Sequence, residues 1–402
     1  MRRLWSLWSV VFALAIGYAV VACSQERPEE SGGGTSNGTG TKVTTVKLGA
    51  VLPLTGPNAS FGQEASNAAK LAVKQWNEAG KIPGVRVEYI VEDDASDAKQ
   101  AVAAARRLVE DPGVIAVVAH FNSGCLLPAS PTYHRAGVMA VTPAATNPQI
   151  TEQGFEEIAR VCSHDKVQGM AAAMFMAKQG WKTVAVIHDR TQYGEGLAGV
   201  VQKNAASQGL TVQSFDGINV GDKDFKALLT KIKSQNPDVV YFGGLQEEAS
   251  FLVRQMKDLG MKSQFVSDDG TYGQDFLNNA GPAAEGVIVS FPSTPLEELP
   301  NAAGFLEDYK KEYGVPVLNW GPYAYDTASL LLEAMRKALA DPSDTPLRKK
   351  VVHYTRSEPF DGILGRLEFD EKGDQVNQKF SFYRVEGGKY KYLETISRKA
   401  SP

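Results

Sequence analysis

Short runs of apolar, mostly β-branched residues alternate with longer amphipathic stretches along most of the chain, beginning near Val46. A strand buried on both faces forms a continuous apolar run, whereas a helix that covers a sheet has apolar residues every three or four positions. This alternation is typical of parallel sheets covered by helices, the α/β class. The pattern first predicts strands at 46–54, 85–93, 114–120 and 138–142, with helices at 62–78 and 97–110.

A second series of the same kind begins after Asp165 and predicts another α/β lobe. Two lobes also fit the length of 402 residues, because a single core rarely grows beyond about 250–300 residues. The pattern predicts strands at 183–189, 210–216, 238–244, 264–268 and 286–291, a helix at 165–180, and later helices at 303–313 and 322–340.

The last part of the chain contains polar segments that predict β-hairpins at 364–374 and 379–394, too few strands for a third lobe. We therefore expect the hairpins to complete the first two lobes, so that the chain crosses between the lobes more than once. The predicted N-terminal lobe comprises 44–163 with about 292–374, and the predicted C-terminal lobe comprises 164–291 with about 375–397.

The chain begins differently, with a basic start, an apolar run over 10–22 and Cys23 directly after Val-Val-Ala. This order is typical of a secretory signal that ends in a lipobox, so we expect residues 1–22 to be removed and Cys23 to carry a lipid. A transmembrane anchor is the alternative, but a span needs about 20 apolar residues and serines interrupt this run. Residues 23–43, rich in glycine, serine and threonine, predict a flexible tether. The protein is thus expected outside the cytoplasm, attached to a membrane only through the lipid.

Charge and motif content narrow the class of protein. The formal charge of −4 becomes −6 without the signal, and the chain has no long basic block, which argues against a nucleic-acid partner. The five histidines show no HExxH or HxH spacing, and no GxSxG is present, so we predict neither a metal centre nor a serine hydrolase. Ser123 near His120 fits a helix cap or an anion-binding hydroxyl better than a nucleophile.

One motif resembles a cofactor site. GEGLAG over 194–199 has the GxGxxG spacing of a dinucleotide-binding loop, and Asp216 ends the next strand where a ribose-binding acid would fall. The first glycine should stand in the tight turn that leaves the strand, but residues 190–193 intervene. We therefore predict small residues opening a helix, no cofactor and no enzyme, with an NAD-dependent enzyme as the least favoured alternative.

The carboxyl ends of the predicted strands carry the candidate ligand-binding groups, because ligands bind there in open α/β sheets. In the first lobe these ends are rich in hydroxyls, glycines and backbone amides, at 53–56, 120–124 and 142–146. In the second lobe they carry carboxylates and an aromatic, at 189–193 and 268–270. A cleft with these two kinds of wall suits a zwitterion.

Two features stay open on the sequence alone. The pair Asp93-Asp94 fits a metal ligand or a strand end facing water equally well, although Asp268-Asp269 faces the hydroxyl-rich loops of the opposite lobe. Once Cys23 carries a lipid, Cys125 and Cys162 remain, and in an exported protein they either pair or stay free.

From about Val46 to Thr395 the chain resembles the branched-chain amino acid (Leu/Ile/Val) binding proteins of ABC transporters, which have the type I periplasmic-binding fold. The likeness is carried by LPLTGPNASFGQEASNAAKLAV, DDASDAKQAV, PASPTYHRAGVMAVTPAATNP, VIHDRTQYGEGLA, DFKALLTKIK, VVYFGG and FDEKGD. The resemblance implies two Rossmann-like lobes with parallel sheets, joined by a hinge of several crossings that closes like a Venus flytrap.

The resemblance also implies a ligand site between the lobes. On the first lobe, Ser123, Thr146 and the backbone groups of Ala144 and Ala145 would receive the ligand carboxylate and part of its ammonium. Amide groups at a helix N-terminus favour an anion there.

On the second lobe, the resemblance implies that Tyr193 closes over the ligand and that Asp269 replaces the usual ammonium-binding glutamate. Phe61 would supply an aromatic wall. Leu245 takes a place where a closing aromatic is often found, and Cys125 stands among what are usually hydroxyl residues, so the side-chain specificity stays open.

The function that the resemblance implies is that of a lipid-anchored, monomeric solute-binding protein. It would capture an aliphatic amino acid and deliver it to an ABC permease without chemistry, and the closed form is what the transporter would recognise. A receptor for a related small amide or carboxylate and a ligand-binding sensor are the alternatives.

Overall fold

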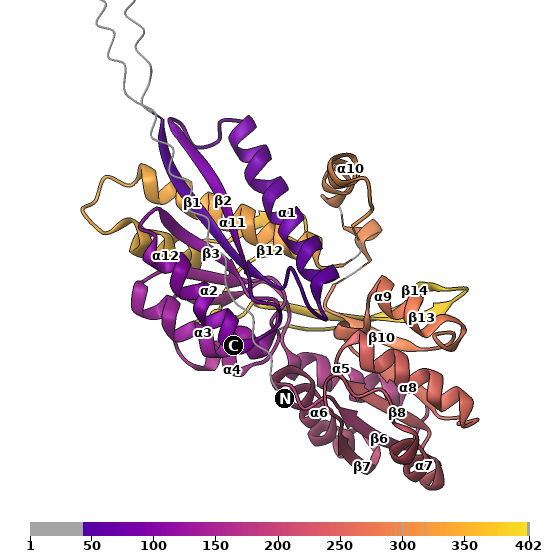
Figure 1. Ribbon diagram of the computed structural model, residues 1–402. Coiled ribbons are helices and arrows are strands. Elements are labelled where there is room, and N and C mark those ends of the chain that lie inside the picture. The colour runs from indigo at the N-terminus through magenta and orange to yellow at the C-terminus, as the bar shows by residue number, and fades with distance from the viewer. Residues whose placement is uncertain (1–42, 294, 300, 318, 400–402) are drawn as a thin grey trace, which may run out of the picture. The chain divides into compact units, whose positions relative to one another are not determined.

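The computed structural model describes residues 43–293, 295–299, 301–317 and 319–399, and these contain two large sheets with helices packed on them (Figure 1). The first sheet contains five described strands, all parallel, in the order β2-β1-β3-β4-β5. Their bounds are β1 (Thr44–Leu52), β2 (Val85–Asp93), β3 (Val114–Ala119), β4 (Met139–Thr142) and β5 (Ile158–Arg160).

The second sheet has seven described strands in the order β14-β13-β10-β9-β8-β6-β7, and only the pairs that include β13 are antiparallel. Its strands are β6 (Thr183–His188), β7 (Thr211–Gly217), β8 (Val239–Gly243), β9 (Gln264–Ser267), β10 (Ile288–Phe291), β13 (Asn377–Glu386) and β14 (Lys389–Lys399). A small hairpin is made by β11 (Phe360–Gly362) and β12 (Gly365–Leu367).

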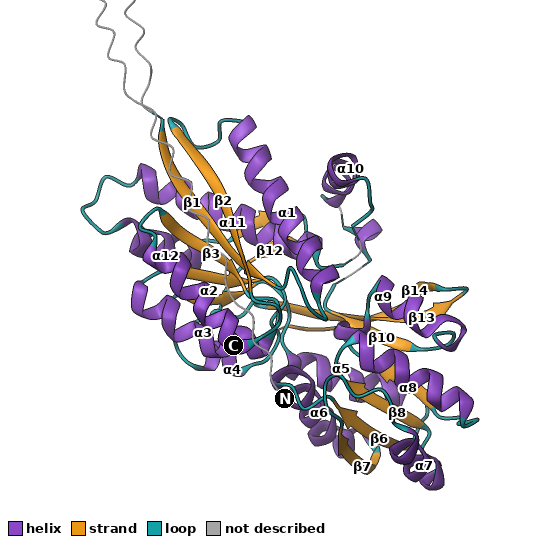
Figure 2. Ribbon diagram, viewed as in Figure 1, coloured by secondary structure: helices purple, strands orange, loops and turns teal. Residues whose placement is uncertain are grey.

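Helices lie between the strands along the chain and cover both sheets (Figure 2). They are α1 (Ala59–Glu78), α2 (Ala98–Glu110), α3 (Ser123–Ala136), α4 (Gln149–Glu152), α5 (Asp165–Lys178), α6 (Gln192–Ala205), α7 (Lys226–Gln235), α8 (Gln246–Asp258), α9 (Gln274–Ala280), α10 (Ala302–Tyr313), α11 (Gly321–Ala340) and α12 (Leu347–Ser357). We call the first sheet with its helices the N-terminal lobe and the second sheet with its helices the C-terminal lobe.

Strand β1 shows why both faces of the first sheet are covered. Its alternate residues Leu48, Ala50 and Leu52 pack in one core with apolar residues of α1 and α11. Val51 points to the other face and packs with residues of α2 and α3. Successive side chains of a strand point to opposite faces, so an apolar run such as β1 needs helices on both sides.

The chain passes between the two lobes three times within its described segments. It leaves the first sheet after β5 and enters the C-terminal lobe with α5. After β10 it returns, since α11 packs against α1, and after β12 it crosses again to place β13 and β14 in the second sheet. The predicted α/β class with repeated crossings is therefore confirmed, whereas the residue-by-residue division into lobes stays a prediction.

Some predicted elements differ from the structure. The hairpin predicted at 364–374 turns earlier, because β11 and β12 pair on either side of Ile363-Leu364. The hairpin predicted at 379–394 is formed by β13 and β14, but it is not simply polar: Phe380, Phe382 and Val385 are fully buried. Helix α12 was not predicted, because its five charged or histidine residues obscure the apolar pattern of its short buried face.

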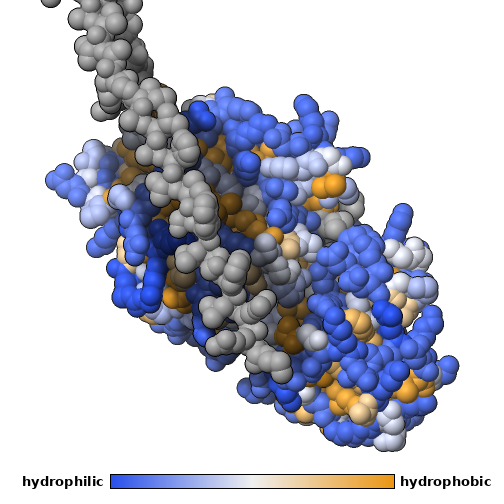
Figure 3. Space-filling view, viewed as in Figure 1, coloured by the Kyte–Doolittle hydropathy of each residue, from blue (hydrophilic) through white to orange (hydrophobic). Residues whose placement is uncertain are grey.

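The surface in view is mostly hydrophilic, with hydrophobic residues in small separate patches (Figure 3). The large apolar side chains that are exposed lie on different elements: Val43, Val91, Met174, Val220, Val315 and Tyr392. Among the described residues, no helix combines the length and the apolar character that crossing a bilayer requires. The predicted signal, Cys23 and nearly all of the predicted tether lie outside the described residues.

Candidate functional site

A cavity with about 290 Å³ of empty space lies between the lobes. The part of this space that a water molecule can occupy is only about 20 Å³, so the cavity is nearly closed in this conformation. The residues that line it come from both lobes: Phe121, Asn122, Ser123, Ala144, Tyr193, Leu245, Asp269, Gly270 and Trp320.

The N-terminal lobe presents the start of α3 to the cavity. In the sheet, Val51 pairs with Ala119 and Val118 pairs with Val141, so the loops that follow β1, β3 and β4 leave the same edge. Helix α3 begins at Ser123, whose Oγ accepts a hydrogen bond from the backbone N–H of Asn147 at 3.2 Å. The positive end of the dipole of this 14-residue helix therefore faces the cavity and favours an anionic group.

Thr142 fixes the loop that follows β4. Its hydroxyl donates to the carbonyl of His120 at 2.7 Å and accepts the backbone N–H groups of Ala144 and Ala145 at 3.1 and 2.8 Å. The ring of His120 is held at both nitrogens, by Asp94 at 2.7 Å and by the hydroxyl of Tyr133 at 3.0 Å. His120 is consequently a structural residue and no base for Ser123.

The buried guanidinium of Arg160 also holds the loop that follows β4. Its Nη1 donates to the carbonyls of Ala145 and Asn147 at 3.0 and 2.9 Å, and its Nε donates to Asp374 at 2.5 Å. Both backbone polar groups of Ala145 thus have partners inside the protein. Asp374 immediately precedes the segment that crosses to β13, so one ion pair joins the site loop to the hinge.

The C-terminal lobe presents acids and an aromatic hydroxyl. Tyr193 in α6 donates its hydroxyl to Asp269 Oδ1 at 3.0 Å and accepts the N–H of Gly270 at 3.2 Å. Asp268 accepts hydrogen bonds from the backbone N–H groups of Gly244 and Gly270, at 3.0 and 3.1 Å. Burial raises the pKa of Asp269 to about 6, although the side chains of Gln168 and Tyr193 work against this shift.

The two lobes present opposite electrostatic character to the cavity. Of the described residues that line it, none is a lysine or arginine, so no cation of the lining neutralises Asp269. The α3 N-terminus lies on the other lobe, and Phe121, Leu245 and Trp320 supply apolar walls. This arrangement fits a small molecule that carries an ammonium, a carboxylate and an apolar group.

The structure brings five of the eight predicted site residues into the cavity lining: Ser123, Ala144, Tyr193, Leu245 and Asp269. Ala145 and Thr146 are buried next to the lining, and Phe61 stands behind it, with its ring stacked on Phe121 at a centroid distance of 5.3 Å. The roles of all eight in ligand binding stay predictions.

Four lining residues were given no individual role by the sequence: Phe121, Asn122, Gly270 and Trp320. Three of them nevertheless gave a signal, because Phe121 and Asn122 lie in the candidate strand end 120–124 and Gly270 lies in 268–270. Trp320 gave none, because it stands alone before α11 and reaches the site through edge-to-face contacts with Phe121 at 5.5 Å and Phe291 at 4.9 Å.

The glycines of 194–199 have a packing explanation. They lie inside α6, whose first turn is capped by the Thr191 hydroxyl accepting from the N–H of Gly194 at 2.9 Å. A Cβ on Gly194 would lie 2.3 Å from Asp189 Oδ1, and one on Gly196 would lie 2.8 Å from Asn147 Nδ2 of the other lobe. The motif therefore lets the helix approach a strand end and the opposite lobe closely.

The open features of the sequence are also settled. Asp93 accepts from the backbone N–H of Leu54 at 2.8 Å, and Asp94 is fully buried against His120, so the expectation that this strand end faces water is wrong for Asp94. In the described segments, no group of three or more His, Cys, Asp or Glu is placed to hold a metal ion. Cys125 and Cys162 are both buried and free, so they do not pair.

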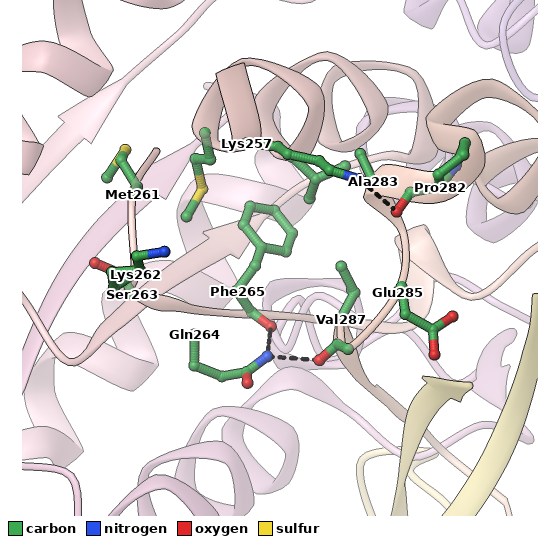
Figure 4. Close-up of a pocket in the computed structure, with 13 residues that line it drawn as sticks. Lys257, Met261, Lys262, Ser263, Gln264, Phe265, Pro282, Ala283, Glu285 and Val287 are labelled. Carbon is green, nitrogen blue, oxygen red and sulfur yellow. Dashed lines mark hydrogen bonds between the residues drawn. The ribbon is translucent and has the colours of Figure 1, made fainter. Parts of the chain in front are cut away.

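A larger, open groove of about 740 Å³ lies within the C-terminal lobe, between α8, β9 and the start of β10 (Figure 4). Its polar groups bond to each other: Lys257 Nζ donates to the carbonyl of Pro282 at 3.2 Å, and Gln264 Nε2 donates to the carbonyl of Gly286 at 2.7 Å. Because these polar groups already have hydrogen-bond partners, the groove offers a ligand fewer free polar groups than the cavity between the lobes does.

Comparisons with known proteins bear on the class of protein to which the chain belongs. The family model described as "Periplasmic binding protein" matches residues 45–389. The chain is 37% identical over 360 residues to Leu/Ile/Val-binding protein homolog 1 of Brucella suis, covering 88% of this chain and 95% of that protein. It is 38% identical over 341 residues to a leucine-, isoleucine-, valine-, threonine- and alanine-binding protein of Pseudomonas aeruginosa, covering 84% and 89%.

A solved structure is similar throughout. The branched-chain amino acid transporter substrate binding protein of Streptococcus pneumoniae, in complex with isoleucine, matches with a TM-score of 0.81 and 25% identity over 88% of this chain and 100% of that chain.

The bonds of Thr142 predict a specific mutational result. Thr142→Val should lower the free energy of unfolding by about 1–3 kcal/mol, because two backbone N–H groups lose their buried acceptor. Thr142→Ser keeps the hydroxyl and should restore most of the loss. Chemical denaturation of the three proteins measures this, and a valine variant as stable as the wild type would contradict the role given to the hydroxyl.

Proposed function

We propose, starting from the fact that this chain belongs to the periplasmic binding protein family, that it captures an aliphatic α-amino acid between its lobes and delivers it to an ABC permease. The relatives named above are binding proteins rather than enzymes, and the proposal accordingly involves no chemical step. Two of those relatives bind branched-chain amino acids by name, which makes leucine, isoleucine and valine the first ligands to test.

The observation that carries the proposal is the polarity of the cavity. Asp269 is buried, has no lining cation beside it and accepts only part of its possible hydrogen bonds from Tyr193. An isolated buried carboxylate is costly, so a ligand ammonium placed there would recover free energy. The start of α3 with Ser123 would receive the carboxylate of the same molecule.

The apolar walls of the cavity support an aliphatic side chain. Phe121 and Trp320 meet edge to face, and Leu245 precedes the first residue of α8. Only about 20 Å³ of the cavity can be occupied by a water molecule in this conformation, so the lobes would have to separate to admit the ligand. The aliphatic side chain would gain roughly 25 cal/mol for each Å² of apolar surface that it removes from water.

Closure of the lobes would follow from the same contacts. Across the lobes Asn147 Nδ2 donates to the carbonyl of Gln192 at 2.5 Å, and Gln246 Nε2 donates to Ser60 Oγ at 3.4 Å. Asn319 Nδ2 also donates to the carbonyl of Tyr272, so the lobes already share direct bonds, and a ligand that bonds to both lobes would add free energy that favours the closed form. The permease would then recognise closed, loaded protein.

Anchoring through Cys23 is part of the proposal. The apolar run over 10–22 and the lipobox support it, and the tether of 23–43 would leave the lobes free to move near a membrane. Stable anchoring would require more than one acyl chain on Cys23, because a single chain binds a membrane only marginally and reversibly.

Asp269→Asn tests the ammonium site. A charge-assisted hydrogen bond contributes roughly 1.5–3 kcal/mol, so the variant should bind L-leucine about 10- to 100-fold more weakly. The α-keto acid of leucine lacks the ammonium and should bind poorly to the wild type and lose little more in the variant. Isothermal titration of both ligands with both proteins gives the four affinities.

The outcome that contradicts the proposal is equally specific. If the keto acid binds the wild type as tightly as leucine does, Asp269 does not receive an ammonium. The protein would then be a receptor for a carboxylate or amide instead of an amino acid.

Cys23→Ser tests the anchor. The variant should leave the membrane fraction while keeping its thermal midpoint and its affinity for leucine, because the lipid is separated from the lobes by the tether. Fractionation of cells followed by a high-salt wash measures this. Retention of the serine variant on membranes would show that something other than the Cys23 lipid holds the protein.

A further inference from the structure

Asp165, the first residue of α5, is the buried acid that the site described above leaves unexplained. It is completely buried, and neither carboxyl oxygen has a hydrogen-bond partner in the described part of the chain. Its backbone N–H donates to the carbonyl of Thr146 at 3.0 Å, which fixes it beside the site loop of the N-terminal lobe. A buried polar group without a partner requires a physical explanation.

Other buried acids of this protein are satisfied by backbone donors. Asp326 accepts the N–H groups of Ile363 and Leu364 at 3.0 and 2.8 Å. Asp268 likewise accepts two backbone N–H groups, as described above. The fold can therefore pair its buried carboxylates, and Asp165 is an exception among them.

A second unpartnered group stands next to Asp165. The Thr146 hydroxyl, 1% exposed, lies near enough to lower the pKa of Asp165, yet no hydrogen bond of good geometry joins the two side chains. Burial raises the pKa of Asp165 to about 8, and the charge of Asp269 adds to this effect, so the two carboxyls sense each other.

Among the described residues, no free cation lies beside Asp165 to compensate its charge. The charged and titratable groups that surround it are Asp269, Arg160, Cys162, Tyr193 and Tyr241, with His164 preceding it in the chain. Arg160 is the one cation among these described groups, and its donors are taken by Asp374, Thr151 and two carbonyls. With a pKa near 8, Asp165 is mostly protonated and neutral at neutral pH in the empty site, and an ammonium brought by a ligand would favour its ionised form.

We propose that Asp165 is a second carboxylate of the ammonium site and receives the ligand together with Asp269 and the hydroxyl of Thr146. This inference rests on the proposed capture of an α-amino acid. An ammonium has three N–H donors, and these three side chains offer one acceptor each. The pair of acids, one brought by α5 and one by the loop after β9, would select for a charged ammonium over a neutral group.

A buried water that bridges Asp165 and Thr146 is the alternative, since such a water commonly satisfies orphaned polar groups. A bridging water would stabilise the fold to the same extent whichever ligand is bound. A role in ammonium binding would change the preference for an amino acid over its keto acid, which a purely structural role would not.

The experiment measures the affinities of leucine and its α-keto acid by isothermal titration for the wild type, Asp165→Asn and Asp165→Ser. We expect both variants to bind leucine about 10-fold more weakly or worse, and the keto acid as well as or better than the wild type does. The serine variant covers the case in which the asparagine variant fails to fold. Asp326→Asn is the matched control, because Asp326 is equally buried but hydrogen-bonded, and it should leave the ratio of the two affinities unchanged.

Equal weakening of both ligands in the Asp165 variants, or unchanged leucine affinity, would overturn the inference. If Asp269→Asn lowers the preference for leucine while the Asp165 variants keep it, the proposed function stands and this inference alone fails. If the wild type itself shows no preference for leucine over the keto acid, the proposed function fails and the role of Asp165 fails with it.

Discussion

The buried ion pair between Arg160 and Asp374 is the constraint on which the site depends. Burial opposes ionisation of Asp374, but the charges of Arg160 and His164 together with the hydrogen bonds from Thr151 and Arg160 outweigh it and hold the pKa of Asp374 below its usual range. Removing one member of such a pair typically costs about 3–5 kcal/mol, because the other charge is left buried alone. The same guanidinium holds the carbonyls of Ala145 and Asn147, so the loop after β4 cannot move independently of the segment that crosses to β13.

The two halves of the site differ in how completely their polar groups are satisfied. The N-terminal half is tied together by Thr142, His120 and Arg160, and it presents a preformed helix N-terminus. The C-terminal half presents acids that the protein does not neutralise. A rigid anion site facing an unneutralised acid site is a natural receptor for a zwitterion, since each end of the ligand completes one lobe and only the closed form satisfies both. This asymmetry links ligand charge to lobe closure.

The sequence predicts most strands of both sheets, because their continuous apolar runs follow directly from burial on two faces, but it misses the three-residue β5. It predicts α12 poorly and gives no clear bounds for α3, whose interior contains Pro128 and Pro131. Motifs near strand ends predict Ser123, Tyr193 and Asp269 as site residues. Such motifs do not identify Trp320 or Asp165. The position of Trp320 depends on ring packing between distant segments of the chain. Asp165 stands out because its carboxyl has no partner, and only tertiary structure determines this.

A crystal structure of the protein grown with L-leucine tests the central claim most directly. The account predicts one leucine in the cavity between the lobes, with its ammonium within hydrogen-bond distance of Asp269, its carboxylate at the start of α3, and its side chain against Phe121 and Trp320. A leucine bound in the reverse orientation, or bound in the groove near Lys257 with the cavity between the lobes empty, would contradict it.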